Sequence, residues 1–182
     1  MLMKRMWLMV VMVCGLSACI APPLGLERNE FTIQSVKKIE PSDYECQCKE
    51  VRLGGKVLSA IALKDQIKIE VLSLPVRGLS AKPSIDGTVE GRFVAYLPGF
   101  IDPEYLKDQF ITVAGKLIKQ EKGKIDQADY WYPVVDVTHY KRWKLVQEYY
   151  YEPDDWDKWG YGRFGWSSRF WRQEPRLRYY LY

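Results

Sequence analysis

The sequence has little of what most enzyme and metal sites are built from. It contains a single histidine, His139, and only four cysteines. It has no nucleophile elbow, no phosphate-binding loop and no metal-ligand spacing. Its longest apolar run is about eleven residues, whereas a membrane-spanning helix needs roughly 20. These absences argue against a metalloenzyme, a nucleotide-binding enzyme and a permanent transmembrane helix, so we expect no catalytic residues, no metal and no cofactor.

Neither sign of charge dominates the sequence. The chain carries 27 Lys and Arg against 23 Asp and Glu, a net charge of +4, with no long run of either sign. Nucleic acid is therefore not an expected partner.

The apolar run that is present lies at the N-terminus and predicts an export signal. Lys4 and Arg5 precede the uncharged segment Met6–Leu16, which is the charge pattern of a signal peptide. We expect residues 1–18 to be removed on export, leaving 164 residues, enough for one domain with a sizeable core.

The end of this signal predicts a lipid anchor. Leu16, Ser17 and Ala18 resemble the lipobox that precedes the acylated cysteine of a lipoprotein, here Cys19. Several acyl chains such as palmitate, each CH₂ contributing about 0.8 kcal/mol, make membrane anchoring effectively permanent. The next residue is Ile20, and the absence of aspartate there favours the outer membrane of a Gram-negative cell. The alternative is an ordinary secreted protein cleaved after Ala18.

Residues 19–30 are expected to hold the lipidated cysteine and a tether. Pro22 and Pro23 stand in a stretch with few large apolar residues, which is typical of a linker. The folded domain is then expected over residues 31–143.

Only one pair of cysteines remains unmodified in the exported chain. Cys14 leaves with the signal and Cys19 is used for acylation, which leaves Cys46 and Cys48. Three alternatives remain: a local disulfide, a bridge to another chain, or two small residues without a special role. No second cysteine pair or nearby histidine completes a zinc site.

Short strands separated by turn residues dominate the domain. Alternating or β-branched runs occur at Val51–Ala60, Ile67–Val71, Arg92–Tyr96, Phe110–Lys119 and Pro133–Trp143. One helical signal, residues 102–108, lies between the third and fourth runs, where Asp102 can cap the first turn and Pro103 is preset for it. Five strands with a helix in this position predict an all-β fold, an OB-like five-stranded barrel followed by an extension.

An ordered set of short blocks resembles the Slp family of outer-membrane lipoproteins. The blocks are Gly54–Val57, Ile69–Pro75, Gly91–Phe93, Gly99–Pro103 and Thr112–Gly115, and the segment Trp156–Gly162 resembles the Trp/Tyr/Gly segment that follows the barrel in that family. The resemblance implies an outer-membrane location, a β fold and a link to starvation or stress induction. It transfers no active site, because no catalytic residues are established for the family, and the Cys46/Cys48 pair departs from its pattern.

Two polar residues in the fifth run are the best candidates for chemistry. His139 alternates with Thr138 and Tyr140, and such a lone strand histidine is more often structural or exposed than catalytic. Asp136 follows Val134 and Val135 in an apolar run, so a buried hydrogen bond is the expectation for it. We therefore do not expect an enzyme.

The C-terminal extension, residues 144–182, is rich in aromatic and arginine residues. Residues 140–182 hold 15 of the 26 aromatic residues of the chain. One interpretation has residues 149–166 fold back across the barrel and bury these rings. Two others make Trp156, Trp159, Tyr161 and Trp166 a binding surface, either at a membrane interface or protein partner, or stacked on the sugar rings of an envelope glycan.

The sequence therefore predicts a non-enzymatic outer-membrane lipoprotein. We expect it to act in envelope maintenance or a stress or starvation response by binding a ligand or glycan. The alternative is a structural assembly component that docks another envelope protein through its aromatic tail. The membrane is the expected partner of the N-terminal lipid.

Overall fold

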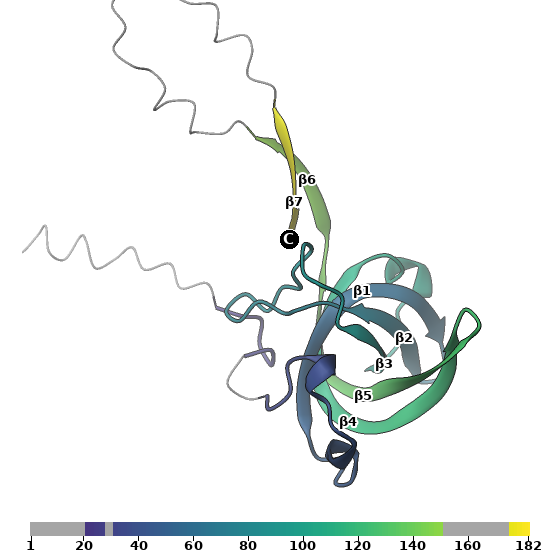
Figure 1. Cartoon of the computed structure of the whole chain (residues 1–182). Helices are drawn as coiled ribbons and strands as arrows, with labels where there is room; N and C mark the ends of the chain where they lie inside the picture. Colours follow the sequence, from purple (N-terminus) through teal and green to yellow (C-terminus); the bar gives the residue numbers. More distant parts are fainter. Residues whose placement is uncertain (1–20, 28–30, 151–174) are drawn as a thin grey trace, which may run out of the picture.

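Five strands form the body of the molecule in the computed structural model, which describes residues 21–27, 31–150 and 175–182 (Figure 1). The strands are β1 (Glu50–Ala62), β2 (Gln66–Ser73), β3 (Gly91–Pro98), β4 (Phe110–Ile125) and β5 (Ala128–Trp143). Each contains one of the five predicted runs, so the prediction of a mostly β chain built on five strands is confirmed. Within the described ranges, no helix is long and apolar enough to cross a membrane.

The five strands close into a barrel in the order β1-β2-β3-β5-β4. Neighbouring strands are antiparallel except β3 and β5, which run parallel where Val94–Tyr96 pairs with Val134–Asp136. The first half of β1 pairs with β4 and its second half with β2, which completes the ring. At the changeover, a Cβ on Gly55 would lie 1.9 Å from the carbonyl oxygen of Leu72. Only glycine permits the two strands to approach this closely, and a glycine inside a strand is typical of such a contact.

The interior of the barrel is apolar because alternate residues of each strand point inward. In β2, Ile67, Ile69 and Val71 are fully buried, while the residues between them are partly exposed. Phe93 of β3 is fully buried in the same cluster. This cluster is the main hydrophobic core of the described residues, and the strands supply most of it.

The predicted helical signal forms a single turn. Asp102 caps the 3₁₀ helix η5 (Pro103–Tyr105), and its Oδ1 accepts a hydrogen bond from the backbone N–H of Glu104 at 3.0 Å. The helix is shorter than the predicted segment and is 3₁₀ rather than α. Asp108 has a φ of +62°, which is incompatible with a right-handed helix.

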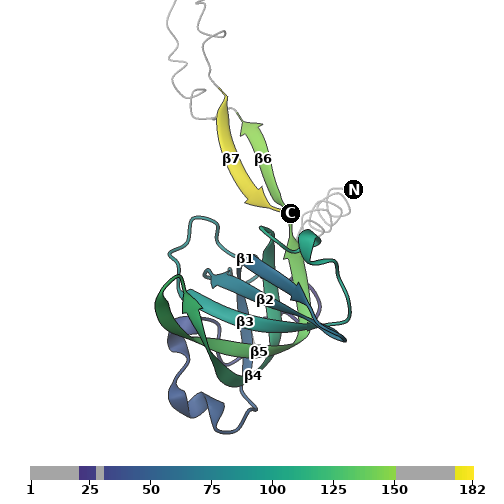
Figure 2. The ribbon, with the colours of Figure 1, turned by 90° about the vertical axis from the view of Figure 1, so that its right-hand side faces the viewer.

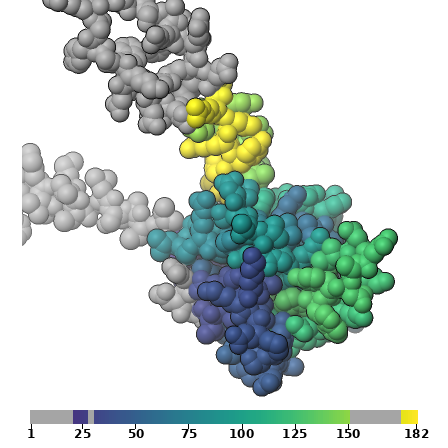
Figure 3. Space-filling model, viewed as in Figure 1, coloured from purple at the N-terminus to yellow at the C-terminus, as the bar shows by residue number. Residues whose placement is uncertain are grey.

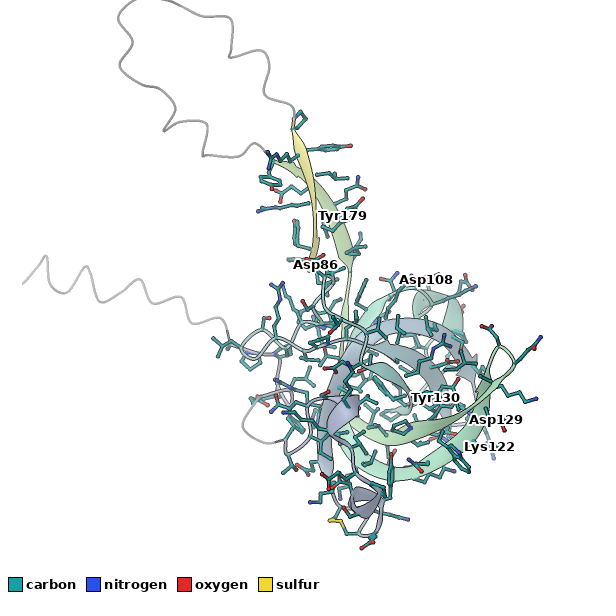
Figure 4. The ribbon with its side chains drawn as sticks, viewed as in Figure 1. Asp86, Asp108, Lys122, Asp129, Tyr130 and Tyr179 are labelled. Atoms are coloured by element: carbon teal, nitrogen blue, oxygen red, sulfur yellow. A yellow bond between two sulfur atoms is a disulfide. The ribbon has the colours of Figure 1, made fainter. Side chains whose placement is uncertain are left out.

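Two further 3₁₀ helices, which the sequence did not predict, precede β1. They are η3 (Val36–Lys38) and η4 (Pro41–Tyr44). The turn after η4 contains Cys46 and Cys48, which a disulfide joins. The sulfur atoms lie at the opposite end of the molecule from β6 and β7 (Figure 4), so this pair is remote from the region described below.

A two-stranded ribbon extends from the end of β5. It consists of β6 (Leu145–Tyr150) and β7 (Arg176–Leu181), which pair antiparallel and project away from the barrel (Figure 2). The space-filling view shows it as a narrow stalk beside the compact barrel (Figure 3). The expectation that residues 149–166 fold across the barrel is wrong for Tyr149, which lies in this ribbon and is 67% exposed.

Candidate functional site

The N-terminal segment packs onto the barrel. Leu26 is buried in a small cluster with Ala81 and Ala114. Gly25, with a φ of +76°, lies so close to the ring of His139 that a Cβ there would be 2.4 Å from the imidazole Cγ. The predicted tether is therefore packed on the barrel at Gly25 and Leu26, because composition predicts a linker but does not reveal the apolar site that receives Leu26.

Arg52 of β1 holds this segment in place. Its Nη1 donates hydrogen bonds to the carbonyl oxygens of Leu26 at 2.9 Å and Gly78 at 3.3 Å, and its Nη2 donates to Oε1 of Gln34 at 2.9 Å. The side chain is fully buried. Sequence reasoning missed this residue, although a charge beside Val51 in an apolar strand was a usable signal.

The base of the ribbon is attached through a chain of buried hydrogen bonds. The indole Nε1 of Trp143, the last residue of β5, donates to Oγ1 of Thr112 at 3.0 Å. That hydroxyl donates in turn to the carbonyl oxygen of Ala81 at 2.6 Å. Ala81 also contacts Leu26 in its cluster, so one loop links the N-terminal segment to the start of the ribbon.

The end of the ribbon is fixed to the same loop, residues 74–90 between β2 and β3. Leu181 is buried with Leu74 and Trp143, and Ile85 packs against them. Nζ of Lys82 donates to the carbonyl oxygen of Leu181 at 2.7 Å. Residues 21–27, the 74–90 loop and the base of the ribbon therefore meet in one region, which we call the junction. In Figure 4, Asp86 marks the loop beside the ribbon.

An open groove of about 710 Å³ lies beside the base of the ribbon. Its lining includes the rings of Tyr105, Tyr140 and Tyr182, together with Asp108 and Arg142. Tyr105 is 70% and Tyr182 79% exposed. The Asp108 carboxylate pairs with Nζ of Lys56 at 2.8 Å, and this hydrogen bond lowers the pKa of Asp108. The groove thus combines exposed aromatic rings with fixed charges.

The outer face of β2 and β3 is covered by the chain itself. Tyr132 lies buried with Val94, and its hydroxyl is 3.2 Å from Oε1 of Glu70. The hydroxyl of Tyr130 accepts a hydrogen bond from the backbone N–H of Arg92 at 3.1 Å. The β4–β5 hairpin that carries both tyrosines therefore occupies this surface (Figure 4).

Two ion pairs hold the hairpin and the two strands together. Nζ of Lys68 donates to Glu121, and Nη1 of Arg92 donates to Glu70 at 2.8 Å. The hydrogen bond with Lys68 lowers the pKa of Glu121, and the same bond raises the pKa of Lys68. These charges have a structural partner, so they are poor candidates for ligand recognition.

The polar residues of β5 have no catalytic environment. His139 is exposed and its Nδ1 lies 3.3 Å from Oγ1 of Thr138. Asp136 is exposed rather than buried, so the expectation of a buried hydrogen bond is wrong: its position in the register points it outward. Among the described residues, no group of three or more His, Cys, Asp or Glu side chains is placed to hold a metal ion.

The sequence-predicted site residues lie mainly outside the described ranges. These are Leu16, Ser17, Ala18 and Cys19 of the lipobox, and Trp156, Trp159, Tyr161 and Trp166 of the aromatic segment. The described segments next to them in the chain, residues 21–27 and β6, both start at the junction.

The fold and the site define a class: a small closed β-barrel domain onto which the segment that follows an export-signal pattern is packed. A family model described as "Outer membrane lipoprotein Slp family" matches residues 16–174. The chain belongs to this family and is an outer-membrane lipoprotein of the Gram-negative type. The resemblance and the location predicted from the sequence are both confirmed.

Curated relatives agree with this assignment. An uncharacterized protein of Haemophilus influenzae is 51% identical over 170 residues, covering 92% of each chain. The lipoprotein YeaY of Escherichia coli K12 is 31% identical over 152 residues, covering 83% of this chain and 78% of its own. The outer membrane protein Slp of Escherichia coli K12 is 29% identical over 163 residues, covering 85% of each. No solved structure matches the chain. The family is not known for enzymatic activity.

Proposed function

We propose that the protein is acylated on Cys19 and serves envelope maintenance or the stress response by binding an envelope glycan without chemical turnover. The observation that supports this most is the groove beside the ribbon, with Tyr105, Tyr140 and Tyr182 in its lining. Aromatic rings offer flat apolar surfaces for sugar rings, and a few fixed polar groups orient a ligand in such a site.

The architecture supports an OB-like assignment. The strand order, the parallel pairing of β3 with β5 and the short helix between β3 and β4 are the arrangement of that barrel. OB-folds bind oligosaccharides on the face around their second and third strands. In this chain Tyr130 and Tyr132 occupy that face, which favours the groove as the binding site.

The groove also reaches the ribbon, which precedes the aromatic segment in the chain. Leu145, at the start of β6, lines the groove, and the residues after β6 include Trp156 and Trp159. We propose that these tryptophans, with Tyr161 and Trp166, extend the aromatic binding surface along the same glycan.

A pull-down with isolated peptidoglycan, and a second one with outer-membrane glycan, test this proposal on the full-length lipoprotein. The unsubstituted protein should be retained, whereas Tyr105→Ala/Tyr182→Ala and Trp156→Ala/Trp159→Ala should be lost. Phe100→Ala is the matched control, because Phe100 is equally exposed at 76% and does not line the groove.

Equal retention of all the variants would refute binding through these aromatic residues, and no retention of the unsubstituted protein would refute glycan binding itself. Crosslinking in cells from Tyr161 checks the alternative. A single discrete protein adduct, together with no retention on glycan, would favour the assembly component over the glycan-binding protein.

A further inference from the structure

The ribbon has two unlike faces. The register of β6 with β7 places Leu145, Gln147, Tyr149, Leu177, Tyr179 and Leu181 on one face, and none of these is charged. The other face carries Val146, Glu148, Tyr150, Arg176, Arg178 and Tyr180. We call these the uncharged face and the charged face.

The charged face is stabilised by its own contacts. Nη2 of Arg178 donates to Oε2 of Glu148 at 2.7 Å. The guanidinium of Arg178 also lies 5.2 Å from the ring centroid of Tyr150 and 5.9 Å from that of Tyr180, which is within cation–π range.

The uncharged face is open beyond its base. Leu181 is buried at the junction and Leu145 lines the groove, whereas Tyr149 is 67%, Tyr179 53% and Leu177 39% exposed. A two-stranded ribbon is at best marginally stable in water on its own, and a contiguous exposed apolar surface marks an interaction site. This face therefore requires an occupant.

The position of the N-terminal segment indicates which occupant is within reach. Leu26 is fixed at the junction, and Cys19 lies seven residues before it, so the cysteine is at most about 25 Å from this point. The ribbon is fixed to the same loop through Lys82, and strands of six residues span about 20 Å. A bilayer that holds the acyl chains of Cys19 therefore lies at a distance from the junction comparable to the length of the ribbon.

Other side chains around the junction suit a lipid surface. Leu24 is 87% exposed in the N-terminal segment, and Leu79 is 75% exposed in the 74–90 loop. Arg77 is exposed in the same loop, and Lys144 is exposed at the base of the ribbon. Apolar side chains interspersed with cations match a surface of acyl chains and lipid phosphates.

We infer that the ribbon is a second membrane contact: the part of its uncharged face beyond the junction and the groove, which carries Tyr149, Leu177 and Tyr179, lies on the lipid surface to which Cys19 anchors the chain. This inference rests on the acylation of Cys19 proposed above. Tyrosine favours the boundary between headgroups and water. The unpaired backbone groups at the ribbon edges oppose burial in hydrocarbon, so the ribbon lies along the headgroup region. The two attachments together set the orientation of the barrel and its groove on the membrane.

Nitroxide labels on the full-length lipoprotein in vesicles of phosphatidylethanolamine and phosphatidylglycerol test this contact. The labelled variants are Tyr179→Cys on the uncharged face and Tyr180→Cys on the charged face. The two positions are adjacent, carry the same native side chain and point to opposite faces. A label at Phe100→Cys reports an exposed aromatic position outside the ribbon.

The measured quantity is the ratio of collisions with lipid-soluble oxygen to collisions with a water-soluble nickel chelate. We expect a ratio several-fold higher at position 179 than at positions 180 and 100. A label at Tyr149→Cys, on the same face in β6, should give the same high ratio as position 179. This second label excludes an effect that is local to position 179.

A ratio at positions 179 and 149 equal to that at position 100 would overturn the inference. Protection of position 179 only in native outer-membrane vesicles, and not in pure lipid, would assign the face to a protein and would also overturn it. The mass of the N-terminal peptide is measured on the same samples. An unmodified Cys19 refutes the proposed anchor, whereas an acylated Cys19 with a water-exposed label at position 179 refutes the ribbon contact alone.

Discussion

The barrel and the ribbon use the same strand geometry with opposite results for their apolar side chains. In the barrel, Phe93 and Ile69 contact side chains from other strands and are fully buried. In the ribbon, Tyr149 and Tyr179 stay largely exposed, and only Leu181, at the base of the same face, is buried against Leu74 and Trp143. The comparison shows that the barrel is stabilised by its own core, whereas the apolar contacts of the ribbon are confined to its attachment at the junction.

The largest expected effect is in the barrel. Phe93→Ala should lower the free energy of unfolding by about 3–5 kcal/mol, because it leaves a cavity in a closed core. Urea unfolding of the full chain measures this. Phe93→Leu is the conservative control and should cost less than about 1.5 kcal/mol. A small loss in the alanine variant would mean that the barrel is no better packed than the ribbon.

Removal of the Arg52 guanidinium, which holds residues 21–27 at the junction, should have the next largest effect. Arg52→Met should cost about 1–3 kcal/mol, because the carbonyl oxygens of Leu26 and Gly78 lose a buried donor. It should also release residues 21–27, which limited proteolysis before Leu26 would detect. The control is Arg77→Met, which changes an exposed arginine of the 74–90 loop. Unchanged cleavage would show that Leu26 docks without Arg52.

The ion pair between the hairpin and β2 should make a smaller, pH-dependent contribution. The hydrogen bond from Lys68 lowers the pKa of Glu121 in the folded chain, so the stabilisation is present above the unfolded-state pKa of Glu121 and is lost as the pH falls through the folded-state pKa. Glu121→Gln should cost no more than about 1 kcal/mol at neutral pH. The loss should disappear in acid, where the two proteins become equally stable.

Chemical unfolding at several pH values measures this difference. Because the pKa of Lys68 is raised, the contribution of the pair persists over neutral pH and is lost only as the pH rises through that raised value. A constant difference between Glu121→Gln and the unsubstituted protein from neutral to acid pH would contradict the assigned pairing.

The smallest effect on stability is expected in the ribbon. Tyr179→Ser should change the free energy of unfolding by no more than about 0.5 kcal/mol, because it alters an exposed side chain. The same change should reduce the lipid contact reported by a label at Tyr149→Cys. A large loss of stability in detergent solution would show that the uncharged face contributes to the fold itself.

The sequence was informative where one physical pattern decides the structure. Alternation located the five strands, since each of them buries one face in the barrel. Asp102 and Pro103 located η5, because capping depends on neighbouring residues alone. Its length was not predictable, since Leu106 turns into the barrel core and Asp108 adopts a positive φ.

The junction and the ribbon depend on contacts between distant residues, and single-sequence patterns do not report these. Leu26 stands in a proline-rich stretch that predicts a linker, and its burial becomes evident only with Ala81 and Ala114 beside it. Arg52 points outward by alternation, and the segment that covers it comes from elsewhere in the chain. In β6 and β7, adjacent tyrosines leave no clear alternation, and no barrel core fixes the register.

The route by which β7 and Leu26 are joined has a mechanical consequence. The buried hydrogen bonds from Trp143 to Thr112 and from Thr112 to Ala81 connect the base of the ribbon to the cluster that holds Leu26. A force applied to the ribbon therefore has a short path to the N-terminal segment along one corner of the barrel.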